Sequence, residues 1–97
     1  MATYIVLCKL TDQGIRNIKD APQRIDAAAK AAEAMGGKMT SFYVTLGEYD
    51  YIAVFEGLTD EAFLSLGLKV GLLGNIRTTS LKAFTTKEFA EIVKKLY

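Results

Sequence analysis

Apolar and polar residues follow two different periods along the chain, and the pattern predicts four strands and three helices. Residues 3–9 and 51–56 are rich in β-branched and large apolar residues without helical spacing, which is typical of strands covered on both faces. Residues 41–46 and 76–83 alternate or become polar, which favours strands at the edges of a sheet.

The first predicted helix spans residues 20–35. Asp20 is placed to cap the free amides, Pro22 falls in the first turn where its missing N–H costs nothing, and Gln23 can reach back to the cap. The glycines Gly36 and Gly37 end the helix. Its apolar stripe comprises Ile25, Ala28, Ala29, Ala32 and Met35.

The other two predicted helices begin at threonines. Thr59 caps a helix that is apolar nearly all round and that Gly71 and Gly74 close. Thr85 and Glu88 form a capping box at the start of the last helix. That helix is expected to bury Phe89, Ile92, Val93 and Leu96.

The order of these elements is the split βαβ pattern of the ferredoxin-like fold, followed by one extra C-terminal helix. Residues 11–17 form a loop with a short helical turn, and residues 47–50 suit a tight hairpin. Short, right-handed connections place strands 3–9 and 51–56 in the middle of a four-stranded antiparallel sheet. We therefore expect a single α+β domain over residues 1–97, without an internal linker.

One face of this sheet needs a cover that the two main helices do not provide. Strand 3–9 offers to that face either Tyr4, Val6 and Cys8 or Ile5 and Leu7, and the face measures about 400 Å². Joining two such faces removes about 800 Å² from water, worth at most roughly 20 kcal/mol, against an association cost of about 4–15 kcal/mol. We expect a homo-oligomer formed through the sheet face, with the C-terminal helix as the main competitor for that surface.

Charge and composition narrow the classes of partner. The chain has 12 basic and 11 acidic residues, scattered without a basic run, which speaks against nucleic acid. No apolar stretch approaches the ~20 residues that span a bilayer, so no membrane partner is expected. The first residues are interpreted as a strand of the mature protein, and with a single cysteine a cytoplasmic location is the default expectation.

The chain contains no histidine, and this removes imidazole catalysis, histidine-held haem and the usual zinc sites. The single cysteine excludes a site with four cysteines. We therefore expect neither a metal nor a cofactor. Cys8 lies in an apolar strand without a cationic neighbour in sequence, which favours a buried, inert thiol.

Candidate polar residues gather at the predicted hairpin. Glu48 and Asp50 flank Tyr49, and two carboxylates this close can raise the pKa of one for acid–base chemistry. The alternative, which we favour, is that Asp50 bonds turn amides while Glu48 is solvated. The tyrosines either line a cleft between sheet and helix or between subunits, or are half-buried strand residues; they are Tyr4, Tyr43, Tyr49 and Tyr51.

Three further residues lie in or beside loops and could bind an anion, namely Arg16, Asn75 and Arg77, although all three also suit an ordinary surface. The glycines of residues 71–75 indicate a helix end, because a phosphate loop would need a following lysine. The candidate ligand-binding set is Tyr43, Glu48, Tyr49, Asp50, Arg16, Asn75 and Arg77.

Three separated blocks, residues 11–16, 41–50 and 73–79, resemble the GYD-domain family of small bacterial proteins. The resemblance covers nearly the whole chain and implies a dimeric α/β barrel of the ferredoxin-like group. Relatives in that group include cofactor-free monooxygenases, haem-degrading enzymes, muconolactone-isomerase-like proteins and the sensing domain of leucine-responsive regulators. This chain departs from the haem enzymes in having no histidine, and from the regulators in having no helix-turn-helix domain.

Two functions remain open from the sequence. The first is a module that binds a small molecule or builds an assembly, favoured by the open sheet face and the scarcity of catalytic groups. The second is a cofactor-independent monooxygenase- or isomerase-like enzyme acting on an aromatic or enolic compound. It requires Tyr43, Glu48, Tyr49, Asp50 and Arg77 to converge in one cavity.

Overall fold

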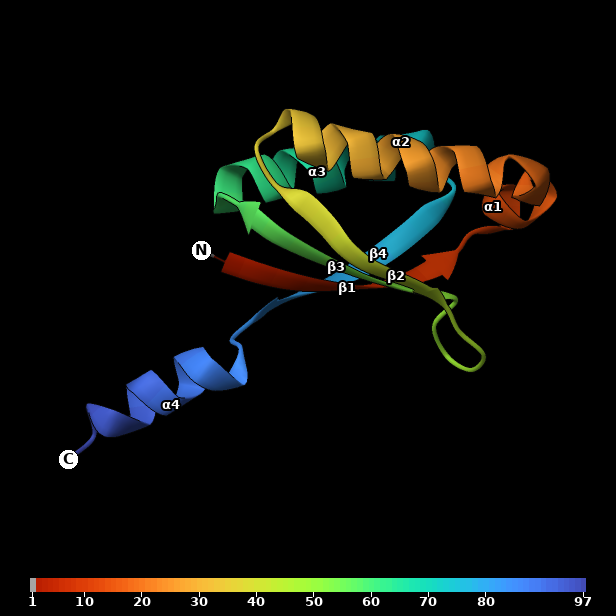
Figure 1. The fold of residues 1–97 in the computed structure, drawn as a ribbon. Coiled ribbons are helices and arrows are strands. Elements are labelled where there is room, and N and C mark those ends of the chain that lie inside the picture. Colours follow the sequence, from red (N-terminus) through yellow and green to blue (C-terminus); the bar gives the residue numbers. More distant parts are fainter. Residues whose placement is uncertain (1) are drawn as a thin grey trace.

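A four-stranded antiparallel sheet with helices on one face organises the chain (Figure 1). The structure, a computed structural model, describes residues 2–97. The strands are β1 (Ala2–Leu10), β2 (Lys38–Val44), β3 (Tyr51–Leu58) and β4 (Ile76–Ala83). The helices are α1 (Asp12–Arg16), a 3₁₀ turn (Ile18–Asp20), α2 (Ala21–Ala34), α3 (Asp60–Leu73) and α4 (Thr86–Lys94).

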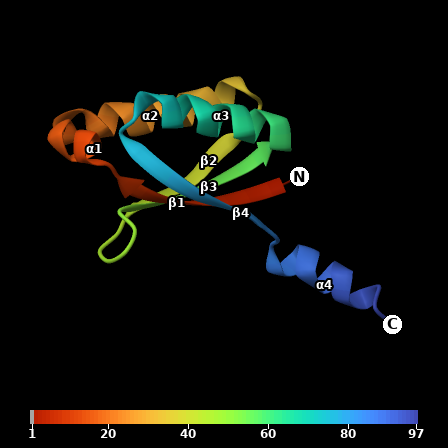
Figure 2. The same cartoon turned by 180° about the vertical axis from the view of Figure 1, so that it is seen from behind.

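The sheet has the strand order β2-β3-β1-β4, which confirms the ferredoxin-like topology and the central position of the two strands that are apolar on both faces. Val6 on β1 pairs with Ala53 on β3 and with Ser80 on β4. Helices α2 and α3 lie together over one face of this sheet, and Figure 2 shows the same layering from behind.

The core lies between the sheet and these two helices. Every second residue of β1 and β3 points into it, and Tyr4, Val6 and Cys8 are buried there. The ring of Tyr4 stacks on Phe63 of α3 with centroids 4.0 Å apart, and its hydroxyl donates a hydrogen bond to Asp60. The aromatic stack and the hydrogen bond fix the start of α3 against the sheet.

The opposite face of the sheet, here called the open face, carries the remaining residues of the same strands. Ile5 and Leu7 on β1 alternate with the buried residues, and Val54 on β3 pairs with Ile5. No helix covers this face within residues 2–97, because α2 and α3 lie on the other side and α4 projects away (Figure 1). The competitor considered from the sequence, the C-terminal helix, therefore leaves the open face uncovered.

The prediction that α4 buries its apolar residues is wrong for the single chain, where most of them are exposed. Phe89, Ile92 and Leu96 are 62%, 45% and 72% exposed, and Val93 is only half-buried. The reason is geometric: β4 runs straight into α4 through the two residues 84–85, which direct the helix away from its own core (Figures 1 and 2). The capping box of Thr85 and Glu88 is confirmed.

Two local predictions also need correction. Asp20 makes no side-chain capping hydrogen bond, because it ends a 3₁₀ turn and its backbone is helical (φ −91°, ψ −1°), whereas a capping residue is extended. The second strand was predicted over residues 41–46, but β2 begins at Lys38 and ends at Val44. It starts directly after Gly37, which follows the left-handed Gly36. Thr45 leaves the ladder to close a longer hairpin loop, its amide donating to the carbonyl of Asp50 and its hydroxyl to that of Tyr49.

Candidate functional site

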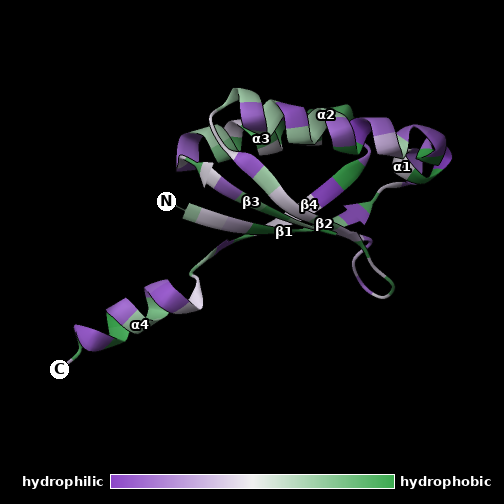
Figure 3. Cartoon of the chain, in the orientation of Figure 1, coloured by the Kyte–Doolittle hydropathy of each residue, from purple (hydrophilic) through white to green (hydrophobic). Residues whose placement is uncertain are grey.

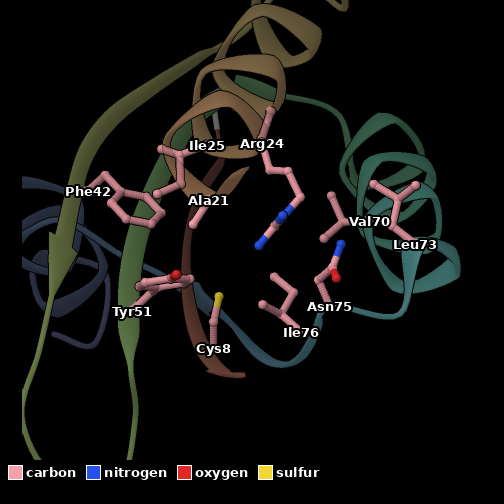
Figure 4. Close-up of a pocket in the computed structure, with 11 residues that line it drawn as sticks. Cys8, Ala21, Arg24, Ile25, Phe42, Tyr51, Val70, Leu73, Asn75 and Ile76 are labelled. Carbon is pink, nitrogen blue, oxygen red and sulfur yellow. The ribbon is translucent and has the colours of Figure 1, made fainter. Parts of the chain in front are cut away.

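A cavity of about 80 Å³ opens between α2, the end of α3 and the helix-covered face of the sheet (Figure 4). We call it the α2 cavity. Its walls are almost entirely apolar, so a hydrocarbon group placed inside loses no hydrogen bond. Helix α2 contributes Ala21, Arg24, Ile25 and Ala28; the sheet contributes Cys8, Phe42, Tyr51 and Ile76; the α3–β4 corner contributes Val70, Leu73 and Asn75.

Arg24 brings the positive charge of this cavity. Its side chain is half-buried and extends from α2 toward the space between Tyr51 and Asn75 (Figure 4). Its Nη1 donates a hydrogen bond to the carbonyl oxygen of Asn17 at 3.0 Å, which orients the guanidinium. The salt bridges found within residues 2–97 join other charges, so the cationic head faces the cavity without a carboxylate partner.

The floor of the cavity carries two groups that ionise with difficulty. Burial raises the pKa of the Cys8 thiol from 9.0 to about 11, and burial also raises the pKa of Tyr51, partly offset by the nearby charge of Arg24. Cys8 is therefore a neutral thiol at neutral pH, and the expectation that it is buried is confirmed.

The raised pKa of Cys8 predicts a loss of stability in alkaline solution. The unfolded thiol ionises near pH 9.0 and the folded thiol near 11. The contribution of the neutral thiol to the free energy of unfolding is therefore complete below pH 9 and falls as the pH rises toward 11. Urea unfolding between pH 8 and 10.5 should show this decline in the native chain and a shallower one in Cys8→Ala. Equal slopes in the two proteins would contradict the burial of the thiol.

A second cavity of about 70 Å³ adjoins the first beneath α3. The two share Cys8, Ala28, Phe42, Val70 and Ile76, so they are neighbouring parts of one loosely filled layer between helices and sheet. A ligand longer than the first cavity could extend into this second space.

Hydrogen bonds from α1 fix the corner where α3 turns into β4, and this corner closes one end of the α2 cavity. The Thr11 hydroxyl donates to the carbonyl oxygen of Gly74 at 2.6 Å and accepts from the amide of Gly14 at 3.0 Å. Gln13 Nε2 donates to the carbonyl oxygen of Leu73 at 2.7 Å and to Asn75 Oδ1 at 3.1 Å. Gly74 has φ +79°, the left-handed conformation expected of a glycine that ends a helix.

The candidate anion binders named from the sequence lie in three different places. Asn75 lines the α2 cavity. Arg16 is exposed at the end of α1. Arg77 pairs with Lys9 across β4 and β1 and lies on the open-face side of the sheet, where its Nη1 donates to the carbonyl oxygen of Ile76 at 3.0 Å. Only one of the three therefore belongs to the cavity.

The hairpin candidates form a separate cluster. Glu48 Oε1 lies 3.8 Å from Lys9 Nζ, which in turn lies 5.3 Å from the ring centroid of Tyr49. Asp50 Oδ2 accepts a hydrogen bond from the amide of Leu10 at 2.8 Å, so this carboxylate ties the hairpin to β1. Tyr43 is exposed on the open-face side of β2, and none of these side chains lines either cavity.

The candidates named from the sequence did not include Arg24, the one charged side chain among the described residues that line the cavity. It precedes Ile25 on the helix and lies three residues after Ala21 and four before Ala28. That spacing was the available signal, because residues at i+3 and i+4 share a helix face. Cys8 and Tyr51 were considered, but the floor they form depends on pairing between distant strands.

Metal ions and membranes are two further classes of partner that a chain can bind. Within residues 2–97 no cluster of three or more histidine, cysteine, aspartate or glutamate residues is placed to hold a metal ion. None of the helices in this part of the chain has the length and hydrophobicity needed to cross a membrane.

Comparisons with known proteins agree with the fold. The model of the GYD domain family matches residues 4–93. A protein of Thermus thermophilus named "Glutamine synthetase and cystathionine beta-lyase binding protein" is 29% identical over 97 residues, covering 99% of each chain.

Two solved structures share the architecture. The leucine response regulatory protein LrpA of Mycobacterium tuberculosis matches 87% of this chain with a TM-score of 0.55 at 20% identity, and the match spans 51% of that regulator. The protein TTHA0845 of Thermus thermophilus matches 88% of this chain and 95% of its own with a TM-score of 0.51 at 23% identity. At these identities the likeness concerns the fold alone.

Proposed function

This chain belongs to the GYD domain family. We propose that it is a small, self-associating binding module, and that its α2 cavity holds a small anion with a hydrocarbon group. The observation that carries the proposal is Arg24, a half-buried cation that has no carboxylate partner among residues 2–97 and faces an otherwise apolar cavity. A guanidinium in such surroundings is best satisfied by a carboxylate, which can accept two of its N–H groups.

The size and lining of the cavity define the ligand class. A volume of about 80 Å³ admits a short branched or linear hydrocarbon group, and the adjoining space of about 70 Å³ admits a somewhat longer one. Asn75 stands across from Arg24 and offers an amide as a second polar contact (Figure 4). We therefore propose short aliphatic carboxylates as ligands, with the hydrocarbon part against Cys8 and Ile76.

Thermal denaturation in the presence of isovalerate tests this ligand class. Isovalerate should raise the melting temperature, because a ligand at about 100 times its Kd stabilises the folded state by about 2.7 kcal/mol. The neutral isovaleramide should have a much smaller effect. Arg24→Met should lose the difference between acid and amide, whereas Arg16→Met, the matched control at an exposed arginine, should keep it.

Two outcomes would count against the ligand proposal. Equal stabilisation by acid and amide would show that Arg24 does not recognise the charge. Loss of the effect in Arg16→Met but not in Arg24→Met would place the site at α1.

Self-association through the open face is the second part of the proposal. It is supported by the apolar residues of the two central strands, Ile5, Leu7, Ile52 and Val54, on a face that no element of the described chain covers. A second copy is complementary to this face by symmetry, since a twofold axis brings the same patch to both partners. We also propose a cytoplasmic location, supported by the free thiol of Cys8.

A second candidate function is the binding of another protein. Leu64, Leu68 and Leu72 follow one another at four-residue spacing on α3 and are 62%, 61% and 86% exposed. Such a stripe suits a partner's apolar groove, and the Thermus relative is named for binding two enzymes. Biolayer interferometry with purified glutamine synthetase and cystathionine β-lyase tests whether this chain binds either enzyme. If Leu68→Ser binds as tightly as the native chain, α3 is not the docking surface.

A further inference from the structure

Helix α4 is a well-formed helix that lies away from the other elements of residues 2–97 (Figure 1). Both hydrogen bonds of its capping box are present, between Thr85 and Glu88, at 2.8 and 3.1 Å. The apolar residues of the helix and of the turn that follows it form one stripe at spacings of three and four, namely Phe89, Ile92, Val93 and Leu96. A helix of nine residues is too short to be stable alone in water, so this stripe needs a partner.

The position of α4 makes the chain unusually extended. The radius of gyration is 14.8 Å, whereas a compact chain of this length has about 12.5 Å, and the longest dimension reaches 53 Å. Figure 3 shows hydrophobic and hydrophilic positions interleaved along α4, well away from the rest of the chain. The helix projects on the open-face side of the sheet, opposite α2 and α3 (Figures 1 and 2).

Folding back onto the chain's own open face is disfavoured by the connection. The capping box fixes Thr85 in an extended conformation (φ −70°, ψ 163°), which leaves Phe84 as the one residue free to reverse the direction between β4 and α4. Even if reversed, the helix is about 13.5 Å long and about 10 Å wide, whereas four strands span about 19 Å. It would leave much of the face in water.

We propose that α4 packs on the second copy of a dimer, so that the two chains exchange their C-terminal helices. This inference rests on the proposed association through the open face, because that association places the second copy on the side where α4 projects. A twofold axis makes the exchange reciprocal, so both apolar stripes are buried together. Phe84, itself exposed, would be covered in the same contact.

Isotope mixing distinguishes exchanged helices from helices folded back on their own chain. Unlabelled and ¹⁵N-labelled full-length chains are mixed in equal amounts, unfolded, refolded together and treated with an amine-reactive cross-linker. Mass spectrometry then identifies links from Lys94 to lysines of the core. Exchange predicts that about half of these links join a light and a heavy chain. If the sample is dimeric and no such link joins a light chain to a heavy chain, the exchange is overturned while the dimer stands.

Substitution in the stripe provides a second readout. Phe89→Ser combined with Ile92→Ser should weaken the dimer at least about 100-fold by sedimentation, because two large side chains of each chain lose their burial. Lys87→Ser with Glu91→Ser, on the polar side of the same helix, should leave the affinity within about threefold of the native value. Unchanged or tighter dimerisation of the stripe variant would overturn the exchange, and a native chain that is monomeric would overturn both this inference and the association it rests on.

Discussion

Val54→Glu is expected to convert the protein from a dimer into a folded monomer. Val54 lies on β3 at the centre of the open face, paired with Ile5 on one side and Ser41 on the other. In the monomer the new carboxylate meets water, so the fold should lose little stability. In a face-to-face dimer each copy would bury an unpaired charge, which costs about 3–5 kcal/mol per charge and weakens association by roughly 1000-fold or more.

The control for this change is Ala27→Glu, which adds the same charge at an exposed position of α2 on the far side of the molecule. It should dimerise as the native chain does. Circular dichroism and urea unfolding would establish that both variants are folded, and analytical ultracentrifugation would give their masses. A Val54→Glu protein that remains a dimer would show that association uses another surface.

Gly14→Ala is expected to destabilise the fold by about 2–4 kcal/mol, the largest effect we anticipate for a single methyl group. A Cβ atom at this position would lie 2.0 Å from the carbonyl oxygen of Asn75 and 3.0 Å from Leu10 Cδ2. The carbonyl oxygen of Asn75 belongs to the backbone, so no side chain can rotate to remove this clash. Instead, α1 must move away from the α3–β4 corner. Urea unfolding should show the loss directly.

Gly67→Ala provides the matched comparison. A Cβ atom there meets nothing within 4 Å, so the same substitution should stabilise α3 by about 0.5–1 kcal/mol through helix propensity. If both variants had the native unfolding midpoint, the close contact between α1 and the corner would not exist in solution. The movement of α1 in Gly14→Ala should also weaken ligand binding, since Asn75 borders the α2 cavity.

Much of the fold could be predicted because several local signals agree. The strands that are apolar on both sides proved central, and Thr59 and Thr85 cap their helices as expected. The prediction that α4 buries its apolar residues against its own chain was wrong. Its apolar stripe is typical of a helix with one buried face, but the sequence does not say which chain provides the cover.

The candidate site was less predictable. The α2 cavity joins Arg24 on α2 with Cys8 and Tyr51 on paired strands and Asn75 beyond α3, and only the pairing of distant segments brings them together. The sequence instead indicated charged residues in loops, yet Glu48 pairs with Lys9 and Asp50 accepts a hydrogen bond from the amide of Leu10, so both connect the hairpin to β1. The enzyme alternative required five such groups in one cavity, and neither cavity described here is lined by any of them.

Sedimentation equilibrium of the full-length chain over a range of micromolar concentrations tests the central claim, that a second copy covers the open face. We predict a species of twice the 10.6 kDa of one chain, or a higher multiple, at tens of micromolar. A single 10.6 kDa species throughout that range would contradict it, because the apolar centre of the sheet would then face water in solution.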